Sequence, residues 1–138
     1  MARVVKVTEA KPLGLPGRRS LEIVSGEKGA RAVTLRLVEI PVPRPGEAPR
    51  APHRHGDFEE CIYVLSGEGC TEADSGRHAL KAGDTILIPA GEAHVTRNTG
   101  SEPLVLLCFF PVSDITQRTQ EPGARTLTTT LPLGKGEG

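Results

Sequence analysis

The sequence lacks both the long hydrophobic runs of a membrane protein and the positive charge of a nucleic-acid-binding protein. Its longest apolar run, residues 104–110, has seven residues, whereas a membrane-spanning helix needs roughly 20. The 17 basic and 17 acidic residues cancel, and no segment is strongly basic. We therefore expect no nucleic-acid partner and no membrane partner. The N-terminus also lacks the apolar segment of a secretory signal.

Cysteine is scarce. The three cysteines, Cys61, Cys70 and Cys108, are an odd number and show no C-x-x-C spacing. This usage is typical of reduced thiols in the cytosol rather than of a disulfide framework. We therefore expect a cytoplasmic protein whose thiols pack as small buried hydrophobic groups.

Helical periodicity is missing as well, because apolar residues do not recur convincingly at positions i, i+3 and i+4. Glycine and proline are abundant instead, with 16 and 12 residues in a chain of 138. They interrupt many short β-branched runs. This pattern predicts an all-β sandwich or barrel, and the length predicts one domain.

Turn residues divide the chain into short expected strands. Strands are expected at 20–24, 31–40, 61–65, 68–73, 77–80, 85–88, 94–98 and 104–110. An edge strand is expected at Val4–Thr8 and a loop at 11–19. The stretch 41–52 contains five prolines, so it is expected to be an ordered loop. We expect an N-terminal arm with edge strands over 1–30, a barrel over 31–113 and a C-terminal arm or tail over 114–138.

The strongest chemical signal lies in residues 52–67. His53 and His55 are two apart, so on extended chain their side chains share one face, with Cα atoms roughly 7 Å apart. Two carboxylates, Glu59 and Glu60, follow a short connector. Alternation places Glu60 on the same face as Ile62, yet it does not decide between the two glutamates. Taken alone, the histidine pair favours a surface coincidence over a metal site, because lone H-x-H pairs are common.

A second segment strengthens the metal interpretation. His94 follows the turn residues Pro89 and Gly91 and begins an expected strand that ends at Asn98. A third imidazole therefore enters the chain shortly after a tight turn. Imidazole and carboxylate groups are suited to Zn, Fe, Mn and Ni.

The two segments together resemble the two sequence motifs of the cupin superfamily, in a small single-domain form. The first motif, G(x)5HxH(x)3–4E(x)6G, is matched by His53, His55, Glu60 and Gly67, and its six-residue spacing to the glycine selects Glu60 over Glu59. Its leading glycine is replaced by Glu47. The second motif, G(x)5PxG(x)2H(x)3N, is matched by Gly83, Pro89, Gly91, His94 and Asn98.

The resemblance implies a double-stranded β-helix, or jelly-roll barrel, of antiparallel strands. It also implies one divalent cation (Fe, Zn, Mn or Ni) held by His53, His55, Glu60 and His94. Such a set contains no thiolate and leaves positions for exchangeable ligands. An iron-dependent dioxygenase acting on a small organic substrate is one expected function. The alternatives are a non-redox lyase, isomerase or cyclase and a non-catalytic binding or sensing module. A homodimer is expected.

The remaining polar residues are expected to have structural or surface roles. We expect Asn98 to hold a turn, His78 to lie at the surface, and Tyr63 and Arg97 to point away from the metal. Arg36 lies mid-strand among apolar residues. We expect it to face solvent, the alternative being an inward arginine that binds an anionic substrate group.

Overall fold

The computed structural model describes residues 1–116 and 119–120. Within these residues the chain consists of β-strands and two 3-10 helices, η1 (Val7–Glu9) and η2 (Gly26–Lys28). The predicted all-β class is therefore confirmed. Seven of the expected strands appear within one or two residues of their predicted ends, and the eighth, 31–40, begins three residues later, at Thr34.

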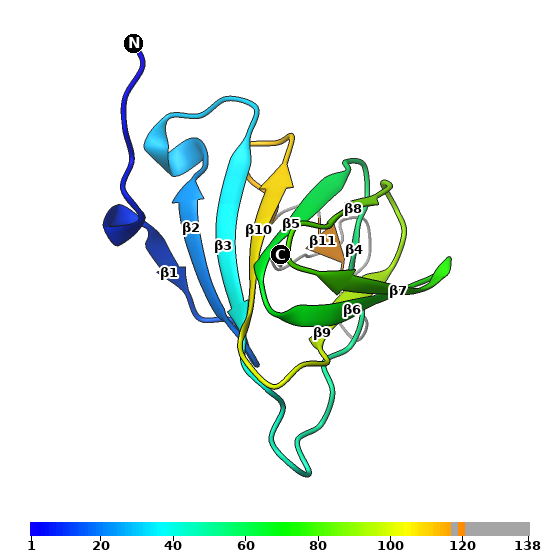
Figure 1. Ribbon diagram of the computed structural model, residues 1–138. Coiled ribbons are helices and arrows are strands. Elements are labelled where there is room, and N and C mark those ends of the chain that lie inside the picture. The colour runs from blue at the N-terminus through cyan, green and yellow to red at the C-terminus, as the bar shows by residue number, and fades with distance from the viewer. Residues whose placement is uncertain (117–118, 121–138) are drawn as a thin grey trace.

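Two antiparallel sheets build a jelly-roll barrel (Figure 1). The larger sheet has the order β1 (Lys11–Leu13), β2 (Arg19–Val24), β3 (Thr34–Ile40), β10 (Leu104–Phe110), β5 (Glu60–Ser66) and β8 (Thr85–Ile88). The smaller has the order β7 (Gly76–Lys81), β6 (Glu68–Ala73) and β9 (His94–Asn98). A short pair, β4 (Arg54–His55) and β11 (Thr119–Gln120), completes the described strands.

The core lies between the sheets and is built by strict alternation along the central strands. Buried and half-buried residues alternate along β3 and along most of β10. The register aligns Val38, Leu106 and Val64 across three neighbouring strands, and all three are fully buried. Burying a side chain of this size contributes about 1.5–3 kcal/mol, so these rows hold the larger sheet against the core.

Two glycines allow β6 to approach β10. Gly67 has a φ of 90°, a conformation that L side chains rarely adopt. A Cβ atom on Gly67 would lie 2.6 Å from the Pro103 carbonyl oxygen, and one on Gly69 would lie 2.5 Å from a Leu104 methyl group. The last glycine of the first motif is therefore required by close packing as well as by backbone conformation.

Three local expectations are wrong. The segment Val4–Thr8 is not a strand, because η1 begins at Val7, and a strand instead forms at Lys11–Leu13, where a loop is predicted. Arg36 does not face solvent but is 1% exposed. Of the predicted tail 114–138, only residues 114–116 and the strand β11 belong to the described part, and the rest of that prediction lies outside the described residues.

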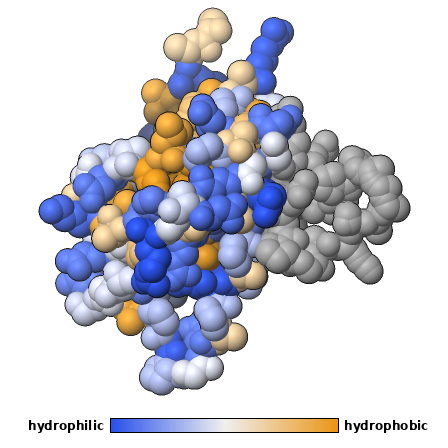
Figure 2. All heavy atoms as spheres, turned by 90° about the vertical axis from the view of Figure 1, so that its right-hand side faces the viewer, coloured by the Kyte–Doolittle hydropathy of each residue, from blue (hydrophilic) through white to orange (hydrophobic). Residues whose placement is uncertain are grey.

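The face on the right-hand side of Figure 1 is mainly hydrophilic, with a hydrophobic patch near its centre (Figure 2). In the described part of the chain, no helix is long and apolar enough to cross a membrane. All three cysteines have free thiols. Cys70 and Cys108 are buried as expected, whereas Cys61 is half-buried.

Candidate metal centre

The backbone brings the two histidine segments together. His53 and His94 form an antiparallel pair in which each N–H donates to the carbonyl of the other, over 2.9 and 2.8 Å. The N–H of Gly91 donates to the His55 carbonyl over 2.6 Å. The turn before His94 is therefore attached to the strand that carries the histidine pair, and main-chain bonds fix the distance between the two motifs.

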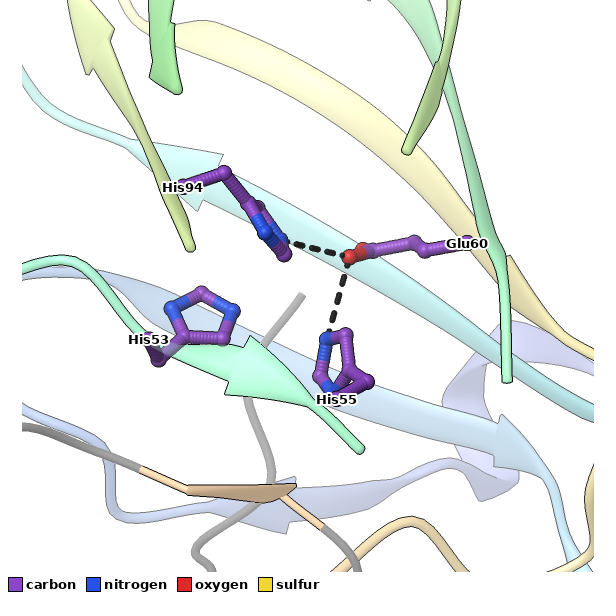
Figure 3. A group of neighbouring side chains, drawn as sticks. All are labelled: His53, His55, Glu60 and His94. Carbon is purple, nitrogen blue, oxygen red and sulfur yellow. Dashed lines mark hydrogen bonds and ion pairs between the residues drawn. The ribbon is translucent and has the colours of Figure 1, made fainter. Parts of the chain in front are cut away.

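Four side chains from these segments point toward one another (Figure 3). His53 and His55 come from the segment of β4, Glu60 begins β5 and His94 begins β9. Each is at most 2% exposed, and one ligand atom from each lies within 4.8 Å of the others. The structure thus brings together all four residues that the motifs predict.

The carboxylate of Glu60 lies between two imidazoles. Its Oε1 is 3.2 Å from Nε2 of His55 and 3.0 Å from Nε2 of His94. Donor atoms bound to one cation at about 2.1 Å are separated by about 3 Å when they occupy adjacent positions. The observed separations therefore match the spacing of neighbouring ligands around one ion.

The orientation of His94 is fixed from its other side. Its Nδ1 lies 3.0 Å from the Glu92 carbonyl, which only accepts hydrogen bonds, so Nδ1 carries a proton and donates. In the neutral ring, Nε2 then presents a lone pair to the Glu60 carboxylate, which is also an acceptor. Two acceptors 3.0 Å apart repel each other unless a cation or a proton lies between them. This donor set fits a metal ion.

The electrostatics favour the metal-binding protonation states. Burial alone would raise the pKa of Glu60, but the hydrogen bonds that Nε2–H groups of His55 and His94 can donate to it in the absence of an ion outweigh burial and hold that pKa below its ordinary value. Burial lowers the pKa of His53 well below its ordinary value, and His94 and His55 act in the same direction. At neutral pH the cluster therefore offers a carboxylate and a neutral imidazole, the forms that bind metals.

Aromatic and sulfur side chains form one wall of the cluster. The Phe58 ring stacks on His55 at a centroid distance of 4.9 Å, and Phe110 meets His55 edge-on at 5.2 Å. Burial and the charge of Glu60 raise the pKa of the Cys108 thiol well above its ordinary value, so the thiol stays neutral. Sequence reasoning missed Phe58, which lies between the motif residues and carries no motif signal.

Arginines surround the centre. Arg36 donates from Nε and Nη2 to the same carboxylate oxygen of Glu22, over 3.0 and 2.8 Å. It is thus an inward arginine whose charge is paired within the protein. Arg18 and Arg50 lie near enough to His53 for their positive charges to lower its pKa further. Arg18 is 9% exposed and donates to the Pro16 carbonyl over 2.6 Å.

The other polar residues singled out in the sequence lie outside the cluster. Glu59 and Tyr63 are exposed, so Glu60 is the inward glutamate. Asn98 donates to the carbonyls of Ile40 and Glu102 and accepts from the Gly100 N–H, which confirms its turn-holding role. Arg97 pairs with Glu72 away from the cluster, and His78 is half-buried and contacts Ser75.

The sequence matches a family model described as Cupin domain over residues 42–110, half of the chain. The uncharacterized protein MJ1618 of Methanocaldococcus jannaschii is 41% identical over 56 residues, which cover 41% of this chain and 45% of that protein. The oxalate-binding protein of Thermotoga maritima is 34% identical over 58 residues, which cover 42% and 48%. The chain spans about half the length of these curated relatives.

Solved structures share the fold at low sequence identity. The oxalate decarboxylase of Lactobacillus farciminis aligns with a TM-score of 0.69 and 22% identity, over 83% of this chain and 34% of that one. The polyketide cyclase RemF of Streptomyces resistomycificus aligns with a TM-score of 0.64 and 24% identity, over 94% and 88%. At these identities the similarity establishes the architecture.

Proposed function

The chain belongs to the cupin family, and on that basis we propose that it is a metal-dependent enzyme acting on a small organic molecule. His53, His55, Glu60 and His94 would bind one divalent cation. The observation that carries this proposal is the Glu60 carboxylate, buried between the Nε2 atoms of two histidines at 3.0 and 3.2 Å. The ion would act as a Lewis acid, polarising an oxygen of the bound molecule.

The protein's own residues would define the remaining surface of the site. Phe58 and Phe110 cover the His55 ring and exclude water from that side. The Glu92 carbonyl keeps the proton of His94 on Nδ1, which leaves Nε2 available as a ligand. Three imidazoles and one carboxylate leave two positions of a six-coordinate ion for exchangeable ligands.

We propose an anionic molecule, such as a small carboxylate, as the substrate class. A divalent cation with one carboxylate ligand retains a net positive charge. The positive charges of Arg18 and Arg50 also act on His53 and lower its pKa, which supports a site that favours anions. The relation to an oxalate-binding protein supports the same class. A non-redox lyase, isomerase or cyclase would use this site, and RemF, a polyketide cyclase, has the same architecture.

An iron-dependent dioxygenase is the second candidate. Open positions on a ferrous ion suit oxygen activation, and the ligand set is compatible with iron. The metal in freshly purified protein, measured by elemental analysis, distinguishes the candidates: iron favours the dioxygenase, and zinc, manganese or nickel favours non-redox chemistry. Iron-loaded protein that consumes no oxygen with a panel of phenols and diketones would exclude the dioxygenase.

A non-catalytic binding module is the third candidate, and the name of the oxalate-binding relative favours it. Tight binding of oxalate without any product after long incubation would support this role. Release of carbon dioxide or formate from oxalate would instead identify a decarboxylase-type enzyme. Binding measured by calorimetry and product measured by chromatography on the same samples separate these outcomes.

We propose a second copy of the chain as the macromolecular partner and the cytoplasm as the location. The outer face of the larger sheet exposes Leu87, Phe109 and Tyr63 on neighbouring strands, which is typical of an interaction surface. The formal net charge of zero means that two copies do not repel each other. The three free thiols suit a reducing compartment.

A further inference from the structure

The tip of the hairpin between β6 and β7 holds the loop that precedes His94. The Asp74 carboxylate accepts a hydrogen bond from the Ala93 N–H, and the Asp74 N–H donates one to the Ala93 carbonyl, both over 3.1 Å. In return, the Glu92 side chain accepts from the Ser75 N–H over 2.8 Å. Each of two exposed turns thus uses a carboxylate to bind the main chain of the other.

This loop delivers the group that orients His94. The Glu92 carbonyl accepts the Nδ1–H of His94 over 3.0 Å, and Ala93 is the residue between them. The His94 main chain is meanwhile paired with Ala73 of β6 and with His53. The main-chain position of His94 is therefore fixed from both sides, while the direction of its ring depends on where the Glu92 carbonyl lies.

The hydrogen bonds between the 74–75 turn and the 92–93 turn, here called the clasp, do not depend on the core. Asp74 and Ser75 are exposed, and Glu92 is half-buried, so neither turn is held in place by deep packing. Beside the main-chain bond from the Asp74 N–H to the Ala93 carbonyl, the carboxylates of Asp74 and Glu92 hold the two turns together.

We propose that Asp74 and the side chain of Glu92 are positioning residues for the metal centre: they fix the 92–93 turn, and through the Glu92 carbonyl they hold the His94 imidazole with Nε2 directed at the ion. This inference rests on the proposed metal site. Groups that orient metal-binding histidines typically change metal affinity by about 10–100-fold when they are removed.

The test compares alanine with amide substitutions. Asp74→Ala and Glu92→Ala remove the acceptor oxygens, whereas Asp74→Asn and Glu92→Gln retain one. Glu72→Ala is the matched control, because Glu72 lies on the same hairpin and pairs with Arg97 and Arg77 without touching the 92–93 turn. Zinc affinity is measured by competition with a chromophoric chelator, and circular dichroism confirms that each variant is folded.

We expect the alanine variants to bind zinc about tenfold more weakly or worse, and the amide variants and Glu72→Ala to stay within about twofold of the wild type. Unchanged affinity in Asp74→Ala and Glu92→Ala would overturn the inference. An equal loss in Glu72→Ala would also overturn it, because the effect would then be a general one of the hairpin.

A second measurement separates this inference from the proposed function. In metal-free protein, the Nδ1–H proton of His94 is expected to give a slowly exchanging NMR signal in the wild type and in Asp74→Asn, and to exchange rapidly in Asp74→Ala. If the wild type binds no zinc, the metal site is refuted, yet the NMR comparison still decides whether the clasp orients His94. Identical exchange in all variants would contradict the positioning role.

Discussion

His53 and His94 each donate a main-chain N–H to the carbonyl of the other, over 2.9 and 2.8 Å, although they belong to different sequence motifs. This pair sets two imidazoles of the cluster on facing segments, with ring centroids 4.4 Å apart. A hydrogen-bonded antiparallel pair holds its two residues in one register. The backbone of the barrel therefore determines how far apart these two imidazoles lie.

The two adjacent glutamates provide a matched test of the cluster. Glu60→Ala is expected to remove most of the bound metal, because it deletes a buried ligand oxygen, while Glu59→Ala is expected to leave the metal content unchanged, since Glu59 is exposed. Elemental analysis of both variants after dialysis checks this. Equal metal retention in the two variants would show that Glu60 is not a ligand.

The resemblance to the two motifs predicts all four residues of this centre, and local features account for some of their positions. Alternation along β5 alone does not decide between Glu59 and Glu60, whereas the spacing to Gly67 selects Glu60. Gly67 itself is needed because a Cβ atom there would clash with the Pro103 carbonyl. Asn98 was likewise predictable, since a short amide side chain at a strand end is suited to binding main-chain groups nearby. In these cases neighbouring residues determine the outcome.

Long-range contacts explain what the sequence did not predict. The inward position of Arg36 depends on Glu22, which only the β2–β3 register places beside it. The role of Phe58, which lies in the loop between β4 and β5, depends on the ring of Phe110 on β10, 6.0 Å away. The clasp between Asp74 and Ala93 joins two turns that have no shared sequence pattern. No local pattern encodes such pairs.

Arg36 and Glu22 are expected to be coupled in stability. Replacing Arg36 with methionine leaves the Glu22 carboxylate without its partner, whereas the double variant Arg36→Met, Glu22→Leu removes both charges. Breaking a buried pair on one side costs about 3–5 kcal/mol, while replacing both partners is often nearly neutral. Glu22 is partly accessible, so we expect about 3 kcal/mol for the single variant.

Urea unfolding of the metal-free proteins measures this coupling. The double variant is expected to regain more than half of the stability lost by Arg36→Met. Additive effects of the two substitutions in a double-mutant cycle would contradict the coupling. An unchanged stability in Arg36→Met would show that the pair contributes nothing to the folded state.

Arg18 is expected to matter for anionic ligands. Arg18→Gln removes a buried positive charge that acts on His53 and therefore weakens the attraction of the site for an anion. We expect oxalate affinity, measured by calorimetry on metal-loaded protein, to fall in this variant. Arg54→Gln, an exposed neighbour of His53, serves as the control. Equal effects of the two substitutions would indicate only a general electrostatic contribution.

The metal-free protein is expected to lose stability as the pH falls below about 6.5, the ordinary pKa of histidine. The pKa of His53 is lowered in the folded state. On acidification the unfolded chain therefore protonates His53 at a higher pH than the folded protein does. The contribution of His53 to the free energy of unfolding is therefore fully present above the pKa that His53 has in the unfolded chain. It is lost as the pH falls toward the lower pKa that His53 has in the folded protein, at up to about 1.4 kcal/mol per pH unit.

Denaturant unfolding at several pH values checks the sign. His53→Asn lacks the titrating group and is expected to flatten the slope between pH 6.5 and 5. A stability that rises on acidification over this range would contradict the lowered pKa.

The outer face of the larger sheet is expected to hold the second copy of the chain. The register places Phe109 beside Cys61, and Cys61 beside Leu87, so two exposed apolar groups and the half-buried Cys61 between them form a row across β10, β5 and β8. Leu87 is 57% exposed and Phe109 40%. In a two-fold symmetric dimer this row would contact the same row of the second copy. A charged residue introduced into the row would therefore face the same charge on the partner and be repelled by it.

We therefore expect Leu87→Lys to shift sedimentation from dimer to monomer while the bound metal is retained, because Leu87 points away from the cluster. Ala79→Lys, an exposed substitution on β7 of the smaller sheet, adds the same charge elsewhere and is expected to leave the dimer intact. Dissociation by both variants would indicate simple charge repulsion. A wild-type protein that sediments as a monomer at all concentrations would exclude the dimer itself.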